Sequence, residues 1–361
     1  MSNETRQMMI RDSRIMITLL SILTVMGVGA VLYQARGIVL PFALAVFFGY
    51  ILNPVILFFE HRKLPSAIAI LISIIITFII LLMVGLLINQ SIQSFAEEFP
   101  FYEDRFSKLM ANVFTNLAKI FKIPPELYNE QLGGSERFQM LADLNQLSMT
   151  DIITTTLSSI TRFLSNTVLV ILFLFFILLG RNQFIKKLDL AFDGKRSAKI
   201  VALFSNVNEQ IQKYILMKTL ISLATAALAA AILFYFEVEF AMIWVILTFL
   251  LNFIPSIGSV IATVLPLTIA LIQFESYLTI LMVALSLTTI QFIMGSVLDP
   301  QIVGGSVNLS PLVVLFSLIF WGWLWGIIGM FLAVPLSVII KIIFENIDEL
   351  RFLSILMSNG K

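Results

Sequence analysis

The polar side chains best suited to chemistry lie in a long stretch of the chain that contains no base. Between Lys218 and Lys341 there is no lysine or arginine, and Asn252, Gln291 and Asp299 interrupt the apolar runs. A carboxylate or an amide at membrane depth is costly without a partner, and such groups commonly line the path of a proton, an ion or a polar solute. Asp299 could exchange a proton or bind a cation, whereas the two amides could hydrogen-bond a solute.

Proline and glycine break the same stretch. In Asn252-Phe-Ile-Pro-Ser-Ile-Gly258, Pro255 ends or kinks an arriving helix, and Gly258 permits backbone geometries that other residues avoid. Free amides and carbonyls at two meeting helix ends can hold a polar solute, as in transporters with broken helices. A tight turn between two spans would use the same residues, so both interpretations stay open. The candidate pathway residues are Asn252, Pro255, Ser256, Gly258, Pro266, Gln291, Asp299, Pro300 and Gly304.

Two dipeptides have the form of helix starts. Asp299-Pro300 and Ser310-Pro311 each place a capping side chain before a proline, which suits the first position of a helix. As an N-cap facing the cytoplasm, Asp299 would be structurally ordinary. As a carboxylate in the pathway, with Gln291 about two turns before it, Asp299 could couple transport to protons.

Enzyme chemistry has few residues to draw on. The chain has no cysteine and one histidine, His61, which lies beside Arg62 and Lys63 in a short link. No phosphate-binding Gly-x-x-x-x-Gly-Lys-[Ser/Thr] motif occurs. No facing carboxylates and no Ser–His set are placed for hydrolysis within the membrane. The sequence therefore predicts that the protein is not an enzyme and has no cofactor and no metal site.

The composition is that of a membrane protein. Hydrophobic residues make up 59% and charged residues 12% of the chain, and the mean hydropathy is +0.99. A helix needs about 20 apolar residues to cross a bilayer. The sequence predicts an all-α polytopic protein with about eight spans, followed by a broken or re-entrant hairpin over residues 311–343 or one long broken helix there. The predicted spans are residues 15–33, 38–59, 64–89, 163–180, 220–236, 240–253, 257–274 and 277–298.

Charge is distributed unevenly among the links between these spans. Bases gather in the N-terminal segment, at residues 61–63 and at residues 181–218, whereas carboxylates outnumber bases in residues 91–151. Because cytoplasmic loops are enriched in bases, the N-terminus is predicted to be cytoplasmic. The predicted regions are a three-span region (1–90), an extracytoplasmic helical segment (91–162), the fourth span with a cytoplasmic amphipathic helix (163–219), a transport region (220–344) and a cytoplasmic tail (345–361).

Two segments outside the spans carry an apolar stripe with a helical period. The outer segment is interpreted either as a helical cap that packs on itself or on neighbouring subunits, or as a vestibule or gate. The inner segment, with bases before its stripe, is predicted to lie in the headgroup layer. The outer stripe is Phe99, Tyr102, Phe106, Leu109, Val113, Leu117 and Ile120, and the inner stripe is Ile200, Leu203, Phe204, Val207, Ile211 and Ile215.

Three blocks of the sequence resemble those of one known family, the autoinducer-2 exporter (AI-2E) family. The segment from Asn252 to Gly258, followed by Pro266, is similar to the Pro-x-x-Gly signature of that family. Leu298-Asp-Pro-Gln-Ile-Val-Gly304 resembles its second block, which often has Glu where this chain has Asp299. The third block is similar to residues 309–322 and 329–335. The resemblance extends over nearly the whole chain.

The resemblance implies a bacterial inner-membrane protein that assembles as a homo-oligomer. Some members are associated with export of autoinducer-2, a small polar quorum-sensing signal, and others with exchange of sodium or lithium for protons. The polar groups of this chain favour a small polar metabolite, because the one candidate carboxylate lies at the end of a span. Na+(Li+)/H+ antiport is the alternative, and a membrane scaffold that transports nothing is the third. The expected partners are the solute or cation, the lipid bilayer and further copies of the chain, with no nucleic acid.

Overall fold

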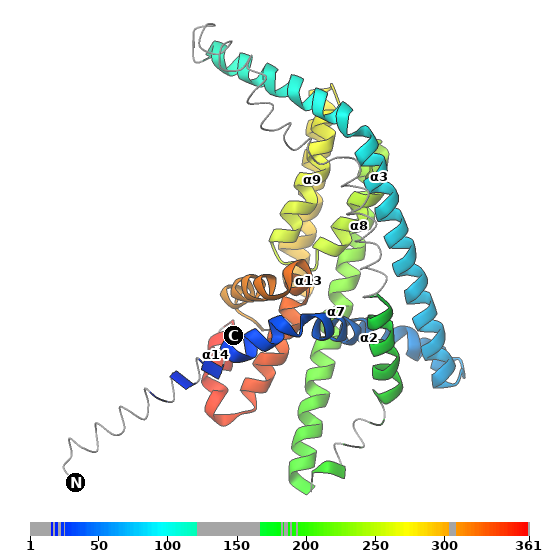
Figure 1. Cartoon of the computed structure of the whole chain (residues 1–361), viewed down its shortest axis with the longest axis vertical. Helices are drawn as coiled ribbons and strands as arrows, with labels where there is room; N and C mark the ends of the chain where they lie inside the picture. Colours follow the sequence, from blue (N-terminus) through cyan, green and yellow to red (C-terminus); the bar gives the residue numbers. More distant parts are fainter. Residues whose placement is uncertain are drawn as a thin grey trace, which may run out of the picture. The chain divides into compact units, whose positions relative to one another are not determined.

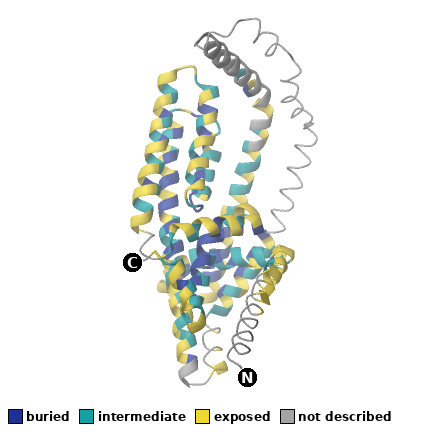
Figure 2. Cartoon of the chain, turned by 90° about the vertical axis from the view of Figure 1, so that its left-hand side faces the viewer, coloured by how far each residue is buried: buried dark blue, intermediate teal, exposed yellow. Residues whose placement is uncertain are grey.

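The computed structural model describes residues 26–120, 167–181, 194–302 and 308–359, with isolated residues near 16–24 and 183–192. Every regular element in these described ranges is helical, so the all-α prediction is confirmed there (Figure 1). Within the described part of the chain, five helices are, by length and composition, long and apolar enough to cross a membrane. These are Arg36–His61, Ser66–Ser91, Ser197–Tyr235, Tyr277–Ile302 and Pro311–Glu345. Large apolar side chains are exposed on these helices, for example Leu278, Leu281 and Leu285 of Tyr277–Ile302, which suits a lipid environment. Exposed residues, drawn in yellow, are distributed along the described helices (Figure 2).

Three further apolar helices have between 10 and 17 described residues: Thr167–Arg181, Ala241–Leu251 and Ile257–Gln273. The second of these has 11 residues. It is therefore about 17 Å long, well short of a hydrocarbon core of about 30 Å. The prediction of a full crossing over residues 240–253 is wrong, because the apolar run includes the turn residues after Leu251. Of the predicted first span, residues 26–33 and isolated residues near 16–24 are described, and residues 26–33 are helical.

Two helices are far longer than a bilayer is thick. The helix α3 (Ser66–Ile120) has 55 residues and α7 (Gly194–Tyr235) has 42, which correspond to about 82 Å and about 63 Å. The outer segment therefore begins as a continuation of the third span. The inner amphipathic segment likewise continues without a break into the following span. No residue between the stripe and the span ends the helix, and the position of the inner segment in the headgroup layer stays a prediction.

The described chain forms two compact units, each built from segments distant in sequence. Unit 1 contains α2 (Arg36–His61), the helix Thr167–Arg181, the first part of α7, α13 (Pro311–Glu345), the 3-10 helix η3 (Asp348–Leu350) and α14 (Arg351–Met357). Unit 2 contains α3, the rest of α7, α8 (Ala241–Leu251), α9 (Ile257–Gln273), α10 (Tyr277–Gln291), the π-helix η2 (Phe292–Leu298) and α11 (Asp299–Ile302).

In unit 1, α13 is a helical hairpin. Gly326 has φ 68° and ψ −149°, which separates two helical arms. The hydroxyl of Ser317 donates a hydrogen bond to the carbonyl of Ala333 and also bonds to the hydroxyl of Ser337, so the arms run side by side in opposite directions. A Cβ on Gly329 would lie 1.9 Å from the carbonyl oxygen of Trp321, so the arms need glycine at their contact. The hairpin prediction is confirmed, and the alternative of one broken helix is wrong.

In unit 2, an apolar core joins α7, α8, α9 and α10. Ala229 and Leu233 of α7 pack in one cluster with Val283 and Leu287 of α10. Residues of α9 and the start of α8 complete this cluster, and α8 and α9 pack against each other as a helical pair (Figure 1). This cluster includes the end of α7 but not its earlier part around Lys218, which packs against other residues.

Candidate solute pathway

Polar side chains occupy the face of α7 that leads away from the apolar core. Lys218, Ser222 and Thr225 are 2%, 0% and 0% exposed. Their spacing of four and then three residues places them on one face of the helix, in line with Ala229. Sequence analysis missed this stripe because Lys218 was read only as the last base before an uncharged stretch. The hydroxyls of Ser222 and Thr225 also lie in an apolar helix, and nothing in the neighbouring sequence indicates which residues they contact.

The charge of Lys218 is matched by a carboxylate from α11. Lys218 Nζ lies 2.8 Å from Asp299 Oδ2, with the two side chains 3% and 21% exposed. The second oxygen of Asp299, Oδ1, is buried and has no hydrogen-bond partner among the described residues. The pair is electrically neutral and retains one free acceptor. Removing either member of a buried pair leaves an uncompensated charge, which is strongly destabilising.

Asp299 is not the helix start that its sequence predicted. Its φ of −59° and ψ of −49° are helical, and η2 leads directly into it. Pro300 follows, where a regular α-helical turn would clash with the proline ring, and the π-helix lies immediately before this point. The Ser310-Pro311 prediction is confirmed instead: the Ser310 hydroxyl accepts from the backbone N–H of Val313 at 3.3 Å, and the proline opens α13.

Gln291 lies where α10 passes into the π-helix. Its Oε1 atom is buried and, among the described residues, has no hydrogen-bond partner. Because α10–η2–α11 runs antiparallel to α7, Gln291 lies on the apolar-core side of Asp299, as Thr225 does of Lys218. Short π-helical segments are rare in proteins overall, but those that occur are often found at functional sites. Gln291 Oε1 and Asp299 Oδ1 are therefore two buried acceptors that a hydrogen-bond donor could satisfy.

The turn between α8 and α9 reaches the same stripe. Asn252 is 5% exposed, and its Nδ2 donates to the hydroxyl of Ser222 at 3.1 Å. Ser256, at the tip, has φ 62°. A Cβ on Gly258 would lie 1.7 Å from the carbonyl oxygen of Leu251, so glycine is required there by close approach of the backbone rather than by an unusual φ.

The two ends of this helical pair are tied together at the far end from the turn. Gln273 Nε2 donates to the carbonyl of Glu237 at 2.8 Å, and its Oε1 accepts from the N–H of Glu239 at 2.9 Å. From these ends α8 extends about 17 Å and α9 about 26 Å, both less than a hydrocarbon core of about 30 Å. Irregular backbone within a membrane survives only when protein or a water-filled cavity covers it. Asn252 supplies part of that cover by packing on α7.

The structure thus brings two predicted pathway residues onto one stripe. Asn252 bonds to Ser222 and Asp299 to Lys218, one helical turn apart on α7. Pro255, Ser256 and Gly258 form the adjacent turn. The other predicted residues are more scattered: Gln291 lies along the Asp299 helix, Pro266 is buried inside α9, Pro300 is exposed in α11, and Gly304 lies outside the described residues.

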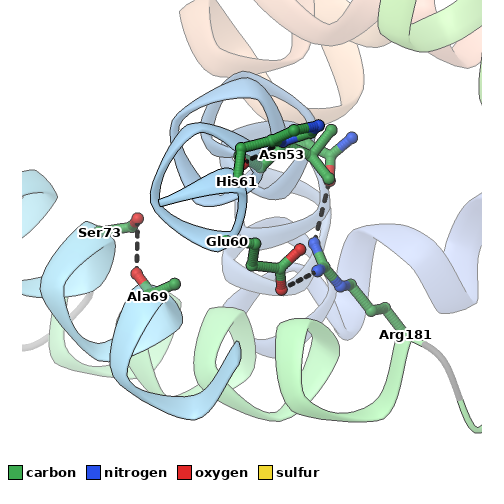
Figure 3. Close-up of polar contacts among 7 residues, drawn as sticks. Asn53, Glu60, His61, Ala69, Ser73 and Arg181 are labelled. Carbon is green, nitrogen blue, oxygen red and sulfur yellow. Dashed lines mark hydrogen bonds and ion pairs between the residues drawn. The ribbon is translucent and has the colours of Figure 1, made fainter. Parts of the chain in front are cut away.

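A second polar network lies in unit 1. Unlike the polar groups around the stripe on α7, its buried polar side-chain atoms all have partners among the described residues. Arg181 Nη1 donates to Asn53 Oδ1 at 3.1 Å, and Nη2 contacts Glu60 Oε1 at 2.6 Å (Figure 3). The guanidinium joins the end of the helix Thr167–Arg181 to α2, which continues through Pro54. Its charge is neutralised and both of these nitrogens are occupied. This network therefore fits a structural clamp better than a solute site. Across the described ranges, no group of three or more His, Cys, Asp or Glu could hold a metal ion.

Comparison with known proteins assigns the chain to a family. The AI-2E family transporter model matches residues 20–349. The chain is 30% identical over 326 residues to the AI-2 transport protein TqsA of Escherichia coli K12, covering 90% of each chain. It is 31% identical over 328 residues to a protein of Borreliella burgdorferi, covering 91% of this chain and 86% of the relative. It is 25% identical over 324 residues to YrrI of Bacillus subtilis 168, covering 88% of each. The names of the last two assign them to transport only provisionally. The chain therefore belongs to the AI-2E family of transporters, which are multi-pass membrane proteins and not enzymes.

Proposed function

We propose that the protein exports a small polar metabolite through unit 2, with autoinducer-2 as the first candidate. The observation that carries this proposal is the buried stripe of Lys218 and Ser222 on α7, which meets Asp299 and Asn252. The name of TqsA, which specifies AI-2 transport, supports the choice of solute. The remaining pathway residues, from Pro255 to Gly258 and Gln291, would line the route.

The chemistry of the stripe suits a polar solute without net charge. Lys218 donates, Asp299 accepts, and the Asn252 amide and Ser222 hydroxyl can do both. A neutral hydroxylated molecule can bond to each group and leave the ion pair balanced. A singly charged solute would instead leave an uncompensated charge in a poorly hydrated site. Hydrogen bonds to charged groups contribute about 1.5–3 kcal/mol each, so a few suffice for transient binding.

Exchange of Na+ or Li+ for H+ is the second candidate, and the carboxylate of Asp299 is the group that could serve it. A carboxylate that now accepts from an ammonium could bind a proton or a monovalent cation in its place. The free Oδ1 of Asp299 offers an additional oxygen ligand. A scaffold that transports nothing is the third candidate, and it would give the buried charges only a structural role.

The cellular setting is part of the proposal. We infer a location in the bacterial inner membrane, with the N-terminus in the cytoplasm, because bases gather in the N-terminal segment and in residues 181–218. A homo-oligomer is also proposed. The C-terminal region, residues 220–344, would then be the transport region and the outer continuation of α3 a contact between subunits or a vestibule.

The test compares internal and external autoinducer-2 in cells that lack the protein, contain it, or contain Asn252→Ala. Deletion should raise the internal pool, and the Asn252 variant should restore export only in part because its bond to Ser222 is lost. Ser259→Ala is the matched control, since its hydroxyl bonds locally to the Ser256 carbonyl. Unchanged pools in the deletion strain, with proton flux driven by Na+ or Li+ in vesicles, would favour antiport. Neither effect would favour a scaffold.

A further inference from the structure

The apolar core of unit 2 lies between two regions of polar groups. On α7, the buried face that carries the polar stripe continues to Ala229 and Leu233, which are 2% and 0% exposed and lie four and eight residues after Thr225. Such spacing keeps all three residues on one side of the helix. Ala229 and Leu233 belong to the apolar core. The buried face of α7 therefore changes from polar to apolar within about one helical turn.

The end of α10 shows the same change from apolar to polar side chains. Val283 and Leu287 are 0% and 3% exposed and pack in the core together with α7. Gln291 follows four residues after Leu287, and its buried Oε1 has no hydrogen-bond partner among the described residues. Because α10 runs antiparallel to α7, Gln291 and Thr225 lie on the same side of the core. The polar stripe and Gln291 thus mark one boundary of the core.

Polar groups return on the opposite side of the core, where loops join the helices. Val238 is 3% exposed and belongs to the core, and the next residue, Glu239, has a buried Oε2 atom without a hydrogen-bond partner among the described residues. The backbone N–H of Glu239 donates to Gln273 Oε1 at 2.9 Å. Arg105 of α3 donates to the carbonyl of Gln273 at 2.8 Å and pairs with Glu275 at 3.1 Å. These residues form the loop side of the core.

The side chains of the core offer a polar solute no hydrogen bond. Every side chain assigned to the core is apolar, and Leu233, Ala270 and Val283 are each 0% exposed. A polar group that enters such a region loses its hydrogen bonds to water without replacement, which is costly. Hydrophobic constrictions close channels in the same way, because they exclude water. The desolvation cost for a solute that passes between the two polar regions is therefore concentrated at the core.

We propose that Leu233, Val283 and Leu287 form the closed gate of the solute route, and that this gate separates the polar stripe from the loop side. The inference rests on the proposed function, which places the route in unit 2, and it adds the residues that close that route. A polar side chain at the gate then admits water and lets a neutral solute leak. The gate acts on any hydrated solute, so it does not depend on the choice of autoinducer-2.

The α8–α9 pair is the element whose movement would open the gate. Its residues Ile269 and Ala270 pack in the core with α7 and α10. On the loop side the pair is held by Arg105, whereas its turn is attached to α7 through the hydrogen bond from Asn252 Nδ2 to Ser222. Release of that bond would let the turn swing away from the stripe while the loop side stays fixed. The apolar side chains of the core would then separate and admit water.

The test measures passive efflux of radiolabelled xylitol from proteoliposomes that contain the purified full-length protein. Xylitol is a small neutral polyol, so it reports a hydrated route whatever the natural solute is. Leu233→Ser and Val283→Thr should each raise the efflux by about tenfold or more, the change that follows when a barrier falls by about 1.4 kcal/mol. Leu233→Met, which keeps the gate apolar, should leave the efflux as low as in the wild type.

The matched controls are Leu174→Ser and Val170→Thr, which introduce the same hydroxyls into unit 1. Leu174 is 0% and Val170 is 5% exposed, so both controls disturb apolar packing outside the proposed route. Neither should leak more than the wild type. Val283→Thr keeps the size and branching of the side chain, so it carries the comparison if Leu233→Ser fails to fold. Unchanged efflux in the gate variants that fold, or an equal rise in the controls, would overturn the gate.

A second readout uses the absence of cysteine from the chain, because one introduced thiol can then be labelled without background. Thr225→Cys should react with a membrane-impermeant maleimide from one face of the membrane only. Adding Leu233→Ser should make the same thiol reactive from the other face as well. Labelling of Thr225→Cys alone from both faces or from neither contradicts the gate, and so does labelling that stays one-sided in the double variant.

The gate and the proposed function can fail separately. If deletion of the protein leaves the autoinducer-2 pools unchanged, but Leu233→Ser leaks xylitol and its control does not, the gate stands and the choice of solute is wrong. If the pools respond to deletion and no gate variant leaks, export stands and the core is only a packing element.

Discussion

Lys218 and Asp299 are 81 positions apart in the chain, yet their Nζ and Oδ2 atoms lie 2.8 Å apart inside unit 2. The contact connects two sides of the candidate pathway, α7 and the end of the π-helical segment. The contact also gives both residues a role that the sequence did not predict. Lys218 is a buried member of an ion pair and not only the last base before the uncharged stretch, and Asp299 is its partner rather than an N-cap at the surface. The energetic consequences of this pairing can be measured directly.

The first prediction concerns the ion pair as a structural element. Asp299→Leu or Lys218→Met alone should destabilise the folded protein by up to about 3–5 kcal/mol, because each leaves an unpaired charge. The double variant should recover most of that loss, since it removes both charges. Unfolding by denaturant or heat in detergent measures the effect. Glu275→Gln is the control, because its carboxylate is 89% exposed and such pairs contribute about 0–1 kcal/mol. Additive losses in the double variant would show that the two charges do not interact.

The second prediction concerns the turn between α8 and α9. Gly258→Val should impair transport while leaving membrane insertion intact, because a Cβ there would lie 1.7 Å from the Leu251 carbonyl oxygen. The turn must then shift away from the stripe on α7. Flux at matched expression is the measurement. Gly180→Ala is the matched control, since a Cβ at Gly180 meets nothing within 4 Å. Normal transport by Gly258→Val would show that the turn only connects two helices.

The third prediction concerns the turn of the α13 hairpin. Gly326 has φ 68° and ψ −149°, a combination that side chains rarely tolerate, yet a Cβ there would meet no atom within 4 Å. Gly326→Ala should therefore destabilise the protein through backbone strain alone, by about 1–3 kcal/mol. Thermal unfolding of the purified protein measures it. An unchanged unfolding temperature would mean that the turn relaxes without cost.

Local sequence signals predicted the features that depend on local chemistry. The cap at Ser310 and the break within residues 311–343 follow from proline, glycine and a hydroxyl at fixed spacings, and both were correct. Asp299-Pro300 carries the same local signal as Ser310-Pro311. Asp299 does not start a helix as predicted, because a π-helix lies before the proline and Lys218 pairs with the carboxylate.

The pairings across the fold had no such signal. Asn252 bonds to Ser222 across 30 positions, and a single sequence contains nothing that aligns them. Hydropathy also overestimated α8, because Phe253 and Ile254 are apolar residues of a turn and extend the apolar run past the helix end. The continuity of α7 from its amphipathic part into its apolar part was missed for the opposite reason. A change in composition suggested a change in direction, although no proline or glycine marks one.

The last prediction separates the two transport mechanisms through Asp299→Asn. If Asp299 couples transport to protons, its carboxyl must gain and lose a proton, and an amide cannot do so. The variant should then lose its dependence on an imposed pH gradient, even where some downhill flux remains. Asparagine keeps the size and one acceptor oxygen, so residual flux reports the pathway and gradient dependence reports the proton. Substrate flux into vesicles against a series of pH gradients measures both. Because Asp299→Asn also leaves Lys218 unpaired, Lys218→Met is the necessary control for the loss of the ion pair. If Lys218→Met keeps gradient dependence and Asp299→Asn loses it, the carboxyl carries the proton. If both variants keep it, Asp299 serves the fold and the coupling group lies elsewhere.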